Sequence, residues 1–375
     1  MKILFPLQVF FPSQAGGTAN AAYWLTKNLC THGFSPTIVS TDQGIGSEIP
    51  LDKWLQNESG RVIYVRTLFT YVPLRQTLVA FRHLLSADVV HLSSFFFPTA
   101  FIIGLAARIL GKKIAWSAHG ELDTYALSIS RVRKRPVLWL LRNVVGTYPM
   151  FHSTCDEETN FIKLSFGSNA RVCQITNYVE IAPKSTRTPG KYFLFIGRLH
   201  QKKGLDNLIR ALAISQAFMI SDLVLKIAGD GSLVYQKTLA DLVNELGLNE
   251  KVEFVGHVEG EAKSRLYSNA HFTFMPSHSE NFGLVVLESL AQETPVVASI
   301  HTPWESLEKE KVGFWIDNSP EALASTIDKI LAMDQTEYEG FRSRSRDFVV
   351  NSFDIKRNFD QWLEFYRLVC ERKEN

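Results

Sequence analysis

KYFLFIGRLHQKKGLDNLI, residues 191–209, changes its hydrophobic pattern around one glycine. Residues 192–196 form a continuous apolar run, which is typical of a strand buried on both faces. From about residue 203 the apolar positions recur with helical spacing. A buried strand that turns through glycine into a helix is the unit from which helix-covered parallel sheets are built, so this stretch predicts an α/β fold.

The same unit recurs on both sides of this stretch. Before it, strands are predicted at KILFPLQV, PTIVS, RVIYV, ADVVHL, KKIAWSA, TYPMFHST and RVCQIT, with helices over 18–31, 99–110, 133–146 and 156–166. From it onward, strands are predicted at KYFLFIG, DLVLKIAG, KVEFVG, HFTFMP and PVVAS, with helices over 203–217, 232–246, 260–269 and 284–292, and the tail after about 319 is predicted to be helical. Alternation of this length predicts two doubly wound domains in tandem.

The boundary between the domains is predicted at IAPKSTRTPG, residues 181–190, which has three Pro or Gly residues and no apolar period. A chain of 375 residues with 46% hydrophobic content is large enough for two domains, since single cores seldom grow past about 300 residues. We therefore predict a first domain over 1–180, a linker over 181–190 and a second domain from 191. Their ligand is expected where the carboxyl ends of the two sheets face each other.

The charge and the cysteine content limit the classes of function that this protein can have. Lys and Arg total 40 against 38 acidic residues, which is too balanced for a nucleic-acid-binding protein. Residues 1–180 carry a net charge of +6 and residues 181–375 a net charge of −4. Four cysteines without metal-type spacing or disulfide density fit a reducing compartment, so we expect a cytoplasmic protein.

Neither apolar run of the N-terminal half is expected to be a leader or a membrane span. ILFPLQVFF after Lys2 resembles a short secretory leader, but Pro6 interrupts it and the register suits strand, glycine turn and helix better. Residues 95–110 contain Pro98 and Gly104 and end near Arg108, below the roughly 18 to 20 apolar residues of a spanning helix.

Several predicted strands of both domains end in residues suited to a nucleotide. Gly16 and Gly17 precede a predicted helix, where backbone amides approach anions, although a double glycine is equally often a simple tight turn. Arg198 and Lys203 follow the strand of residues 191–197 and could neutralise a diphosphate, although such a cluster is more often a solvated turn. IAGDGS and FVGHV end the next two strands in glycine. Three such turns in sequential strands together predict a nucleotide pocket.

SENFGLVVLESL, residues 279–290, places Glu280 just before a predicted helix and Glu288 on its second turn. In one interpretation Glu280 complements the helix dipole and Glu288 is a solvated helical residue. In the other, the helix is apolar enough to be packed on most sides, and its carboxylates need specific partners. Vicinal hydroxyls of a sugar or ribose are suitable partners.

Taken together, these motifs resemble a known family. Gly16-Gly17, GRLHQKKG, IAGDG, FVGHV, and the two glutamates within SHSENFGLVVLESLAQETPVVAS are similar to those of the retaining GT-B nucleotide-sugar glycosyltransferases, family four or "glycosyl transferases group 1". The likeness runs over nearly the whole chain and is most specific in its C-terminal part. It implies two Rossmann-like domains across a cleft, the second over 191–353, with a C-terminal helix over 354–375 that crosses back to the first domain.

The resemblance also implies roles for individual residues. Arg198 and Lys203 would hold the donor diphosphate, Glu288 the ribose, and Glu280 the transferred sugar. His119, at the end of a predicted strand, matches a histidine that reaches toward the donor sugar, although such a histidine is otherwise more often structural. The catalytic set implied is Glu280, His119, Arg198 and Lys203. The donor-binding set implied is Gly16, Gly17, Arg198, Lys203, Gly229, Gly256, His257, Val258, Glu280, Phe282, Gly283, Leu284 and Glu288. No metal and no cofactor besides the UDP- or GDP-linked donor is expected.

Two segments depart from the family pattern. IHTPWESLEKEKVGFWID, residues 300–317, replaces a glycine-rich turn, which leaves the identity of the sugar open. TNYVEI has Tyr178 where the family has glycine, and we expect an effect on hinge geometry only.

The sequence indicates the binding site for the acceptor less clearly than the binding site for the donor. RVRKRPVLWLLRN combines Arg131, Arg133, Lys134 and Arg135 with apolar residues, so it is either a solvated helix start or a contact with anionic lipid or a lipid-diphosphate acceptor. The resemblance implies transfer of a hexose or N-acetylhexosamine to a glycan or polyprenyl-diphosphate-linked acceptor at the inner membrane face, in O-antigen, capsule or lipopolysaccharide synthesis. The alternative functions are an epimerase or a phosphorylase with the same fold, or a non-enzymatic scaffold.

Overall fold

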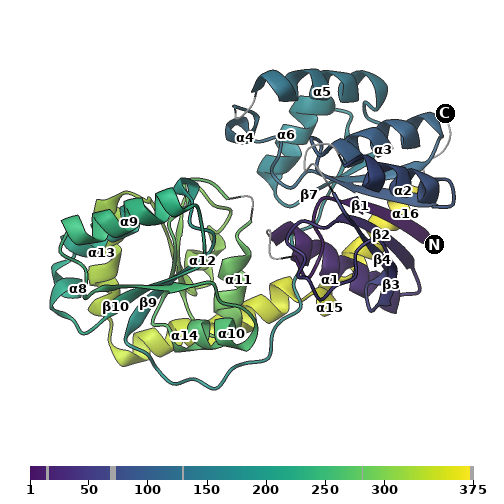
Figure 1. Ribbon diagram of the computed structural model, residues 1–375. Coiled ribbons are helices and arrows are strands. Elements are labelled where there is room, and N and C mark those ends of the chain that lie inside the picture. The colour runs from purple at the N-terminus through teal and green to yellow at the C-terminus, as the bar shows by residue number, and fades with distance from the viewer. Residues whose placement is uncertain (14–16, 68–72, 129–130, 281, 372–375) are drawn as a thin grey trace. The chain divides into compact units, whose positions relative to one another are not determined.

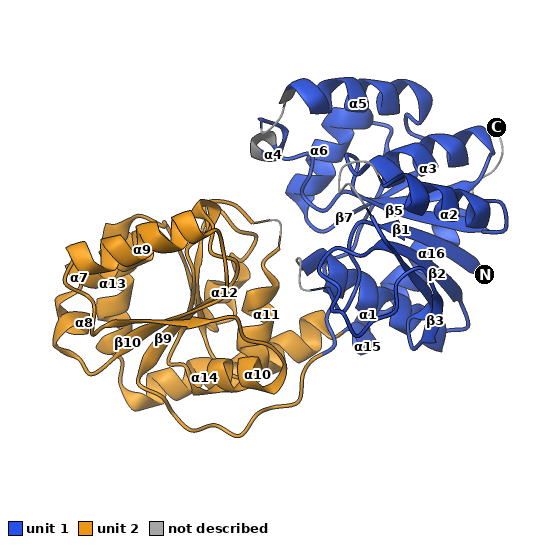
Figure 2. Ribbon diagram, in the orientation of Figure 1, with its two compact units in different colours: residues 1–180, 355–375 blue, residues 181–354 orange. Residues whose placement is uncertain are grey.

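The computed structural model describes residues 1–13, 17–67, 73–128, 131–280 and 282–371. The chain divides into two compact units (Figure 2). The first unit consists of Met1–Glu180 and Ile355–Asn375, and the second of Ile181–Asp354. Among the helices of the described ranges, none combines the length and the hydropathy that crossing a bilayer requires.

The first unit is built on an eight-stranded sheet in the order β3-β4-β2-β1-β5-β6-β7-β8. Its strands are β1 (Lys2–Leu7), β2 (Ser35–Thr41), β3 (Trp54–Asn57), β4 (Gly60–Val65), β5 (Val89–Ser93), β6 (Lys113–Ser117), β7 (Met150–Ser153) and β8 (Arg171–Gln174). All neighbours are parallel except β3, which pairs antiparallel with β4 at the edge. The strand order reverses at β1, which is where doubly wound sheets bind ligands.

Helices cover both faces of this sheet (Figure 1). They are α1 (Gly17–Thr31), α2 (Leu74–Leu84), α3 (Pro98–Ile109), α4 (Thr124–Ser128), α5 (Arg131–Val144), α6 (Asp156–Phe166), α15 (Ile355–Asn358) and α16 (Asp360–Cys370). Alternate strand residues face opposite sides, so Leu4 joins the core under α2, α3, α5 and α6, while Ile3 and Phe5 join the core under α1, α15 and α16. Trp362, Phe365 and Tyr366 bury α16 in this second core.

The second unit contains a six-stranded parallel sheet in the order β11-β10-β9-β12-β13-β14. Its strands are β9 (Tyr192–Ile196), β10 (Val224–Ala228), β11 (Val252–Gly256), β12 (Thr273–Met275), β13 (Val296–Ser299) and β14 (Gly313–Ile316). Its helices are η1 (Gln201–Lys203), α7 (Leu205–Ile214), α8 (Gln216–Ile220), α9 (Leu233–Glu245), α10 (Gly260–Asn269), α11 (Leu284–Ala291), α12 (Ser306–Lys309), α13 (Pro320–Leu331) and α14 (Gln335–Phe353). The predicted α/β class with two parallel-sheet domains is confirmed.

Some local predictions need correction. The helix predicted over 203–217 is a 3₁₀ turn followed by two α-helices, because Ser215 ends α7 and its hydroxyl accepts the Phe218 amide to start α8. The pattern does not predict β3 or β14, which are edge strands with partly exposed residues. It also misses α2, because that helix buries Gln76 and leaves most of its large apolar side chains exposed.

Candidate functional site

Glycines line the carboxyl ends of three neighbouring strands in the second unit. The Gly197 amide donates to the Ala228 carbonyl at 3.0 Å, and the Gly229 amide donates to the Gly256 carbonyl at 2.7 Å. Gly229 has φ of +131°, and a Cβ there would lie 2.0 Å from the Gly197 oxygen. No side chain fits at Gly229, so the backbone itself forms this edge of the sheet. The sequence predicted these turns from separate motifs, and the strand order brings them together.

Lys203 and Glu280 form an ion pair at the same end of the sheet. The Lys203 ammonium donates to Oε1 of Glu280, which also accepts the Ser277 hydroxyl at 3.1 Å. Only 14% of the Glu280 side chain is exposed, against 26% for Lys203. The sequence assigned these two residues to the phosphate and to the sugar, and the structure places the two charges in direct contact.

Backbone packing fixes the loop that carries Glu280. Gly204 has φ of +62°, and a Cβ there would lie 2.2 Å from the Pro276 oxygen. The His278 amide donates to the Lys202 carbonyl at 2.8 Å, and Asn318 donates to the Pro276 carbonyl at 3.0 Å. The turn with Lys203 and the loop with Glu280 are therefore held against each other by main-chain contacts.

The start of α11 is supported by a residue that the sequence analysis did not single out. Gly283 caps the helix with φ of +83°, and Leu284 is its first residue. Phe282 is buried, its ring lies 5.1 Å from that of Trp304, and the Trp304 indole donates to the Phe282 carbonyl. Trp304 belongs to the segment that replaces the family's glycine-rich turn, so that segment helps to position the loop before α11.

Glu288 is held by two side chains of α10. Its carboxylate accepts from the Lys263 ammonium at 2.6 Å and from the Tyr267 hydroxyl at 2.9 Å. Burial, with Glu288 adding to it, raises the pKa of Tyr267 well above its ordinary value, so the phenol stays a donor. The sequence analysis missed both partners, whose spacing of four residues on one helix face was the available signal.

The remaining donor-binding candidates that the structure describes lie on exposed or half-buried turns and at the start of a helix. Arg198 is exposed directly after Gly197, and Val258 is half-buried after β11. The His257 ring lies 3.9 Å from Asp230 and 3.7 Å from Glu259. Gly17 is the exposed first residue of α1 in the first unit. Gly16 lies outside the described residues.

His119 lies in the first unit, at the carboxyl end of β6. Its φ is +50°, and the next amide, of Gly120, donates to the buried carboxylate of Glu158. Burial lowers the pKa of His119, and Glu158 partly opposes that effect. His119 therefore has an unusual backbone conformation, in a turn that the contact between Gly120 and Glu158 holds.

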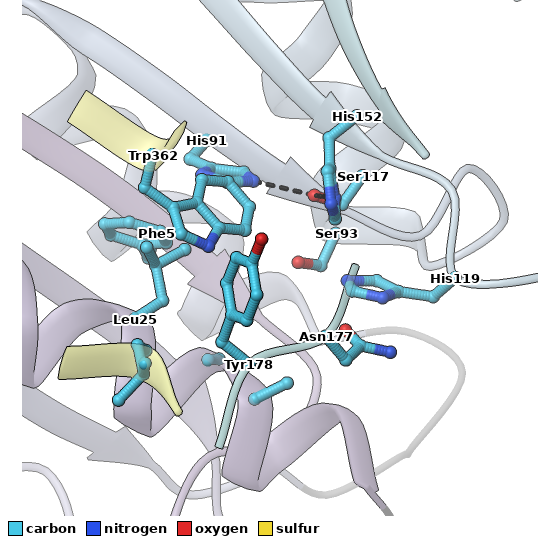
Figure 3. Close-up of a pocket in the computed structure, with 13 residues that line it drawn as sticks. Phe5, Leu25, His91, Ser93, Ser117, His119, His152, Asn177, Tyr178 and Trp362 are labelled. Atoms are coloured by element: carbon cyan, nitrogen blue, oxygen red, sulfur yellow. Dashed lines mark hydrogen bonds between the residues drawn. The ribbon is translucent and has the colours of Figure 1, made fainter. Parts of the chain in front are cut away.

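His119 lines a cavity of about 30 Å³, together with Ser93, Asn177 and Trp362 (Figure 3). Trp362 comes from α16, and its ring lies 4.7 Å from that of His152. Tyr178, which we expected to affect hinge geometry only, is buried and lines the same cavity. The departure from glycine at this position therefore contributes to the interior of the first unit.

A chain of hydrogen bonds runs through the wall of this cavity. His152 Nε2 lies 2.8 Å from the Ile175 carbonyl, which only accepts, so this nitrogen carries the proton. His152 Nδ1 must then accept from Ser117, 2.9 Å away, and Ser117 must accept from His91 Nε2 at 2.8 Å. His91 Nδ1 finally accepts from Tyr366 of α16 at 2.6 Å. Burial lowers the pKa of both imidazoles, so both are neutral near neutral pH and each ring has one donor and one acceptor nitrogen in this chain.

The basic run of the first unit is only partly available for a ligand. Arg133 and Arg135 are exposed on α5. Lys134 donates to the Ala126 carbonyl at 2.6 Å and lies 5.0 Å above the Phe96 ring. The side chain of Arg131 lies outside the described residues.

Comparison with known proteins adds the family context. Residues 179–348 match the family model "Glycosyl transferases group 1". The chain is 37% identical over 144 residues to an uncharacterized glycosyltransferase of Methanocaldococcus jannaschii, a match that covers 38% of this chain and 36% of that protein. The chain thus spans about a third of the length of that curated relative.

Solved structures match over almost the whole chain. Sucrose-phosphate synthase from Thermosynechococcus elongatus has a TM-score of 0.79 and 20% identity, covering 98% of this chain and 99% of that one. HepE from Anabaena, in complex with UDP-glucose, has a TM-score of 0.77 and 18% identity, covering 98% and 100%.

The two parallel-sheet domains define a protein of the GT-B type. Residues 179–348 belong to the glycosyl transferases group 1 family, and the predicted resemblance is confirmed.

Proposed function

We propose that this protein is a retaining glycosyltransferase. It moves a hexose or N-acetylhexosamine from a UDP- or GDP-sugar to a glycan or lipid-linked acceptor in bacterial surface polysaccharide synthesis. The observation that carries the proposal is the contact between Lys203 and Glu280 beside glycine-lined strand ends. The group 1 domain and the UDP-glucose complex of HepE support a nucleotide-sugar donor.

In the proposed reaction, the bond between the anomeric carbon and the donor diphosphate breaks while the acceptor hydroxyl forms a bond on the same face. The departing phosphate takes the hydroxyl proton, and the products are the glycoside and a nucleoside diphosphate. Arg198 and Lys203 neutralise the charge that develops on the leaving group, which in this proposal makes a metal ion unnecessary. Glu280 orients the sugar hydroxyls, and Glu288 accepts from the ribose hydroxyls.

The contact between Lys203 and Glu280 explains how one site can serve a neutral sugar and an anionic leaving group. A carboxylate with 14% of its side chain exposed needs a cationic or hydrogen-bonding partner. A diphosphate beside Lys203 would give the ammonium a second anionic partner, while sugar hydroxyls would donate to Glu280. Donor binding would thus be coupled to the state of this ion pair.

The proposal includes the location of the protein in the cell. A polyprenyl-diphosphate or lipopolysaccharide acceptor would be met at the inner face of the cytoplasmic membrane, so we propose a cytoplasmic, peripherally attached enzyme. The net charge of +6 over residues 1–180 supports attraction of that part of the chain to anionic lipid.

Nucleotide binding is expected to be visible as thermal stabilisation. At a concentration of 100 Kd, UDP or GDP should raise the free energy of unfolding by about 2.7 kcal/mol through mass action. The Glu288→Gln variant should show a smaller shift, because a neutral amide accepts ribose hydroxyls less strongly than a carboxylate. Differential scanning fluorimetry with a panel of nucleotides measures both.

The matched control for this measurement is Glu261→Gln on α10, where Glu261 pairs with Arg265 at 3.5 Å on the exposed surface. It should respond to nucleotide as the wild type does. Absence of stabilisation by every nucleotide would argue for a scaffold without donor binding. Turnover that requires inorganic phosphate would instead indicate a phosphorylase.

A further inference from the structure

The helices α2, α3 and α5 pack on the same face of the sheet of the first unit (Figure 1). Each of them leaves large apolar side chains exposed. On α2 these residues recur every three or four positions and form one stripe, opposite the buried Gln76, Ala80 and Leu84. The exposed apolar residues of the three helices and their C-terminal ends are Leu74, Leu78, Phe81, Leu85, Ile102, Ile109, Leu110, Val132 and Trp139. We call this surface the α2–α3–α5 face.

The orientation of α2 is enforced rather than incidental. The Gln76 amide donates to the carbonyls of Leu7 at 2.6 Å and of Val39 at 2.9 Å, and its oxygen accepts from Thr99 at 2.9 Å. These bonds fix the polar residue against the ends of β1 and β2. The apolar stripe must therefore point away from the sheet.

The three helices of this face carry only basic charges in their own sequences, and Asp52, which lies outside them, pairs with Arg75 at 3.4 Å. The sequences of α2, α3 and α5 contain no Asp or Glu. Their basic residues are Arg75, Arg82, Arg108, Arg131, Arg133, Lys134, Arg135 and Arg142. Exposed apolar side chains on helices that carry basic residues and no acidic ones are complementary to a layer that is apolar inside and negatively charged outside.

A cavity of about 770 Å³ adds a recess to the same face. Leu127 of α4 and Leu138 and Trp139 of α5 line it, together with Arg135 and Arg142. Apolar side chains with guanidinium groups beside them suit an acyl chain below an anionic headgroup.

We infer that the α2–α3–α5 face docks on an anionic phospholipid surface. The inference deepens the proposed membrane location of the transferase and extends it from the basic start of α5 to the stripe on α2. A second copy of the chain is a poorer occupant, because two faces built from helices with several basic and no acidic residues would repel each other. A nucleic acid is also poorer, because it offers nothing apolar to Leu74, Leu78 and Ile109.

Vesicle flotation of the full chain tests this inference. We expect recovery with phosphatidylglycerol-containing vesicles to exceed recovery with phosphatidylcholine vesicles, and to fall when sodium chloride is raised, because salt screens the basic residues. The double variant Leu78→Glu and Phe81→Glu should bind anionic vesicles at least ten-fold more weakly. Both side chains are exposed, so the fold does not depend on them.

The control carries the same change in charge and hydropathy elsewhere. Ile220→Glu and Leu233→Glu alter side chains that are 88% and 82% exposed in the second unit, and this double variant should float like the wild type. Equal recovery of the wild type on neutral and anionic vesicles, or wild-type binding by the Leu78 and Phe81 variant, would overturn the inference. A dimer that this variant abolishes, without vesicle binding, would also overturn it.

The experiment contains neither donor nor acceptor, so its outcome is independent of transfer activity. Nucleotide stabilisation measured on the same variants should match the wild type. Absence of vesicle binding by the wild type, together with normal stabilisation of the wild type by nucleotide, would refute the docking face and leave the transferase proposal standing.

Discussion

Replacing Lys203 with alanine is expected to lower turnover of the correct nucleotide sugar by about 100- to 1,000-fold, the effect typical of removing one group that stabilises transition-state charge. In the proposed mechanism, Lys203 neutralises the leaving diphosphate from a turn that Gly204 holds against Pro276. The variant also leaves Glu280 without its ammonium partner, so donor affinity should fall as well. Steady-state release of nucleoside diphosphate gives both parameters.

The double variant Lys203→Ala with Glu280→Gln separates these effects. Two residues that act as a unit give non-additive losses, so the double variant should be only slightly slower than Lys203→Ala alone. Lys237→Ala is the charge-matched control, since Lys237 pairs with Asp241 on the exposed surface of α9. Near wild-type turnover by Lys203→Ala would refute the proposed role of the ion pair.

Acid is expected to destabilise the first unit by about 2 kcal/mol at pH 5 through His152 alone, an order-of-magnitude figure from proton linkage. Burial, with His119 adding to it, lowers the pKa of His152 to about 3, and burial holds the pKa of His91 well below its usual range. The unfolded chain therefore binds more protons than the folded one below about pH 6.5. This stability is fully present above that pH and is lost as the pH falls toward 3.

Hydrogen–deuterium exchange of β5, β6 and β7 between pH 4.5 and 7.5, corrected for intrinsic exchange, measures this loss. Protection of these strands should fall about 30-fold at pH 5, which is the fold-change that 2 kcal/mol represents. His152→Gln keeps one donor and one acceptor without a titrating ring, so its protection should depend less on pH. An unchanged pH dependence in that variant, and in His91→Gln, would show that these two histidines are not the acid-sensitive groups.

The fold was largely predictable, because a buried parallel strand has a short run of apolar residues, and the segments between these runs have apolar residues at helical spacing. The exceptions have physical causes. β3 and β14 are edge strands with partly exposed residues, so neither has the continuous apolar run of a fully buried strand. A helix usually buries its apolar side chains and exposes its polar ones, and α2 does the opposite. Gln76 is buried and makes three hydrogen bonds, while the apolar stripe faces outward.

The candidate site was predictable only in part. Glycines at strand ends and the two glutamates stand out in the sequence because they break apolar patterns. The partners of those glutamates do not stand out. Lys263 and Tyr267 meet Glu288 only because α10 packs on α11, and Trp304 reaches Phe282 across 22 residues. Such contacts depend on which helices and strands pack against each other, and a single sequence does not show which elements are neighbours in the fold.

The most direct test of the proposed function is hydrolysis of a panel of UDP- and GDP-linked hexoses and N-acetylhexosamines by the purified chain. Released nucleoside diphosphate and the anomer of the freed sugar are followed by nuclear magnetic resonance. We predict that at least one donor is cleaved with its anomeric configuration retained at first, and that Lys203→Ala slows the cleavage by about 100- to 1,000-fold. Cleavage with inversion would contradict the retaining mechanism, and no cleavage of any donor together with no stabilisation by any nucleotide would contradict the glycosyltransferase itself.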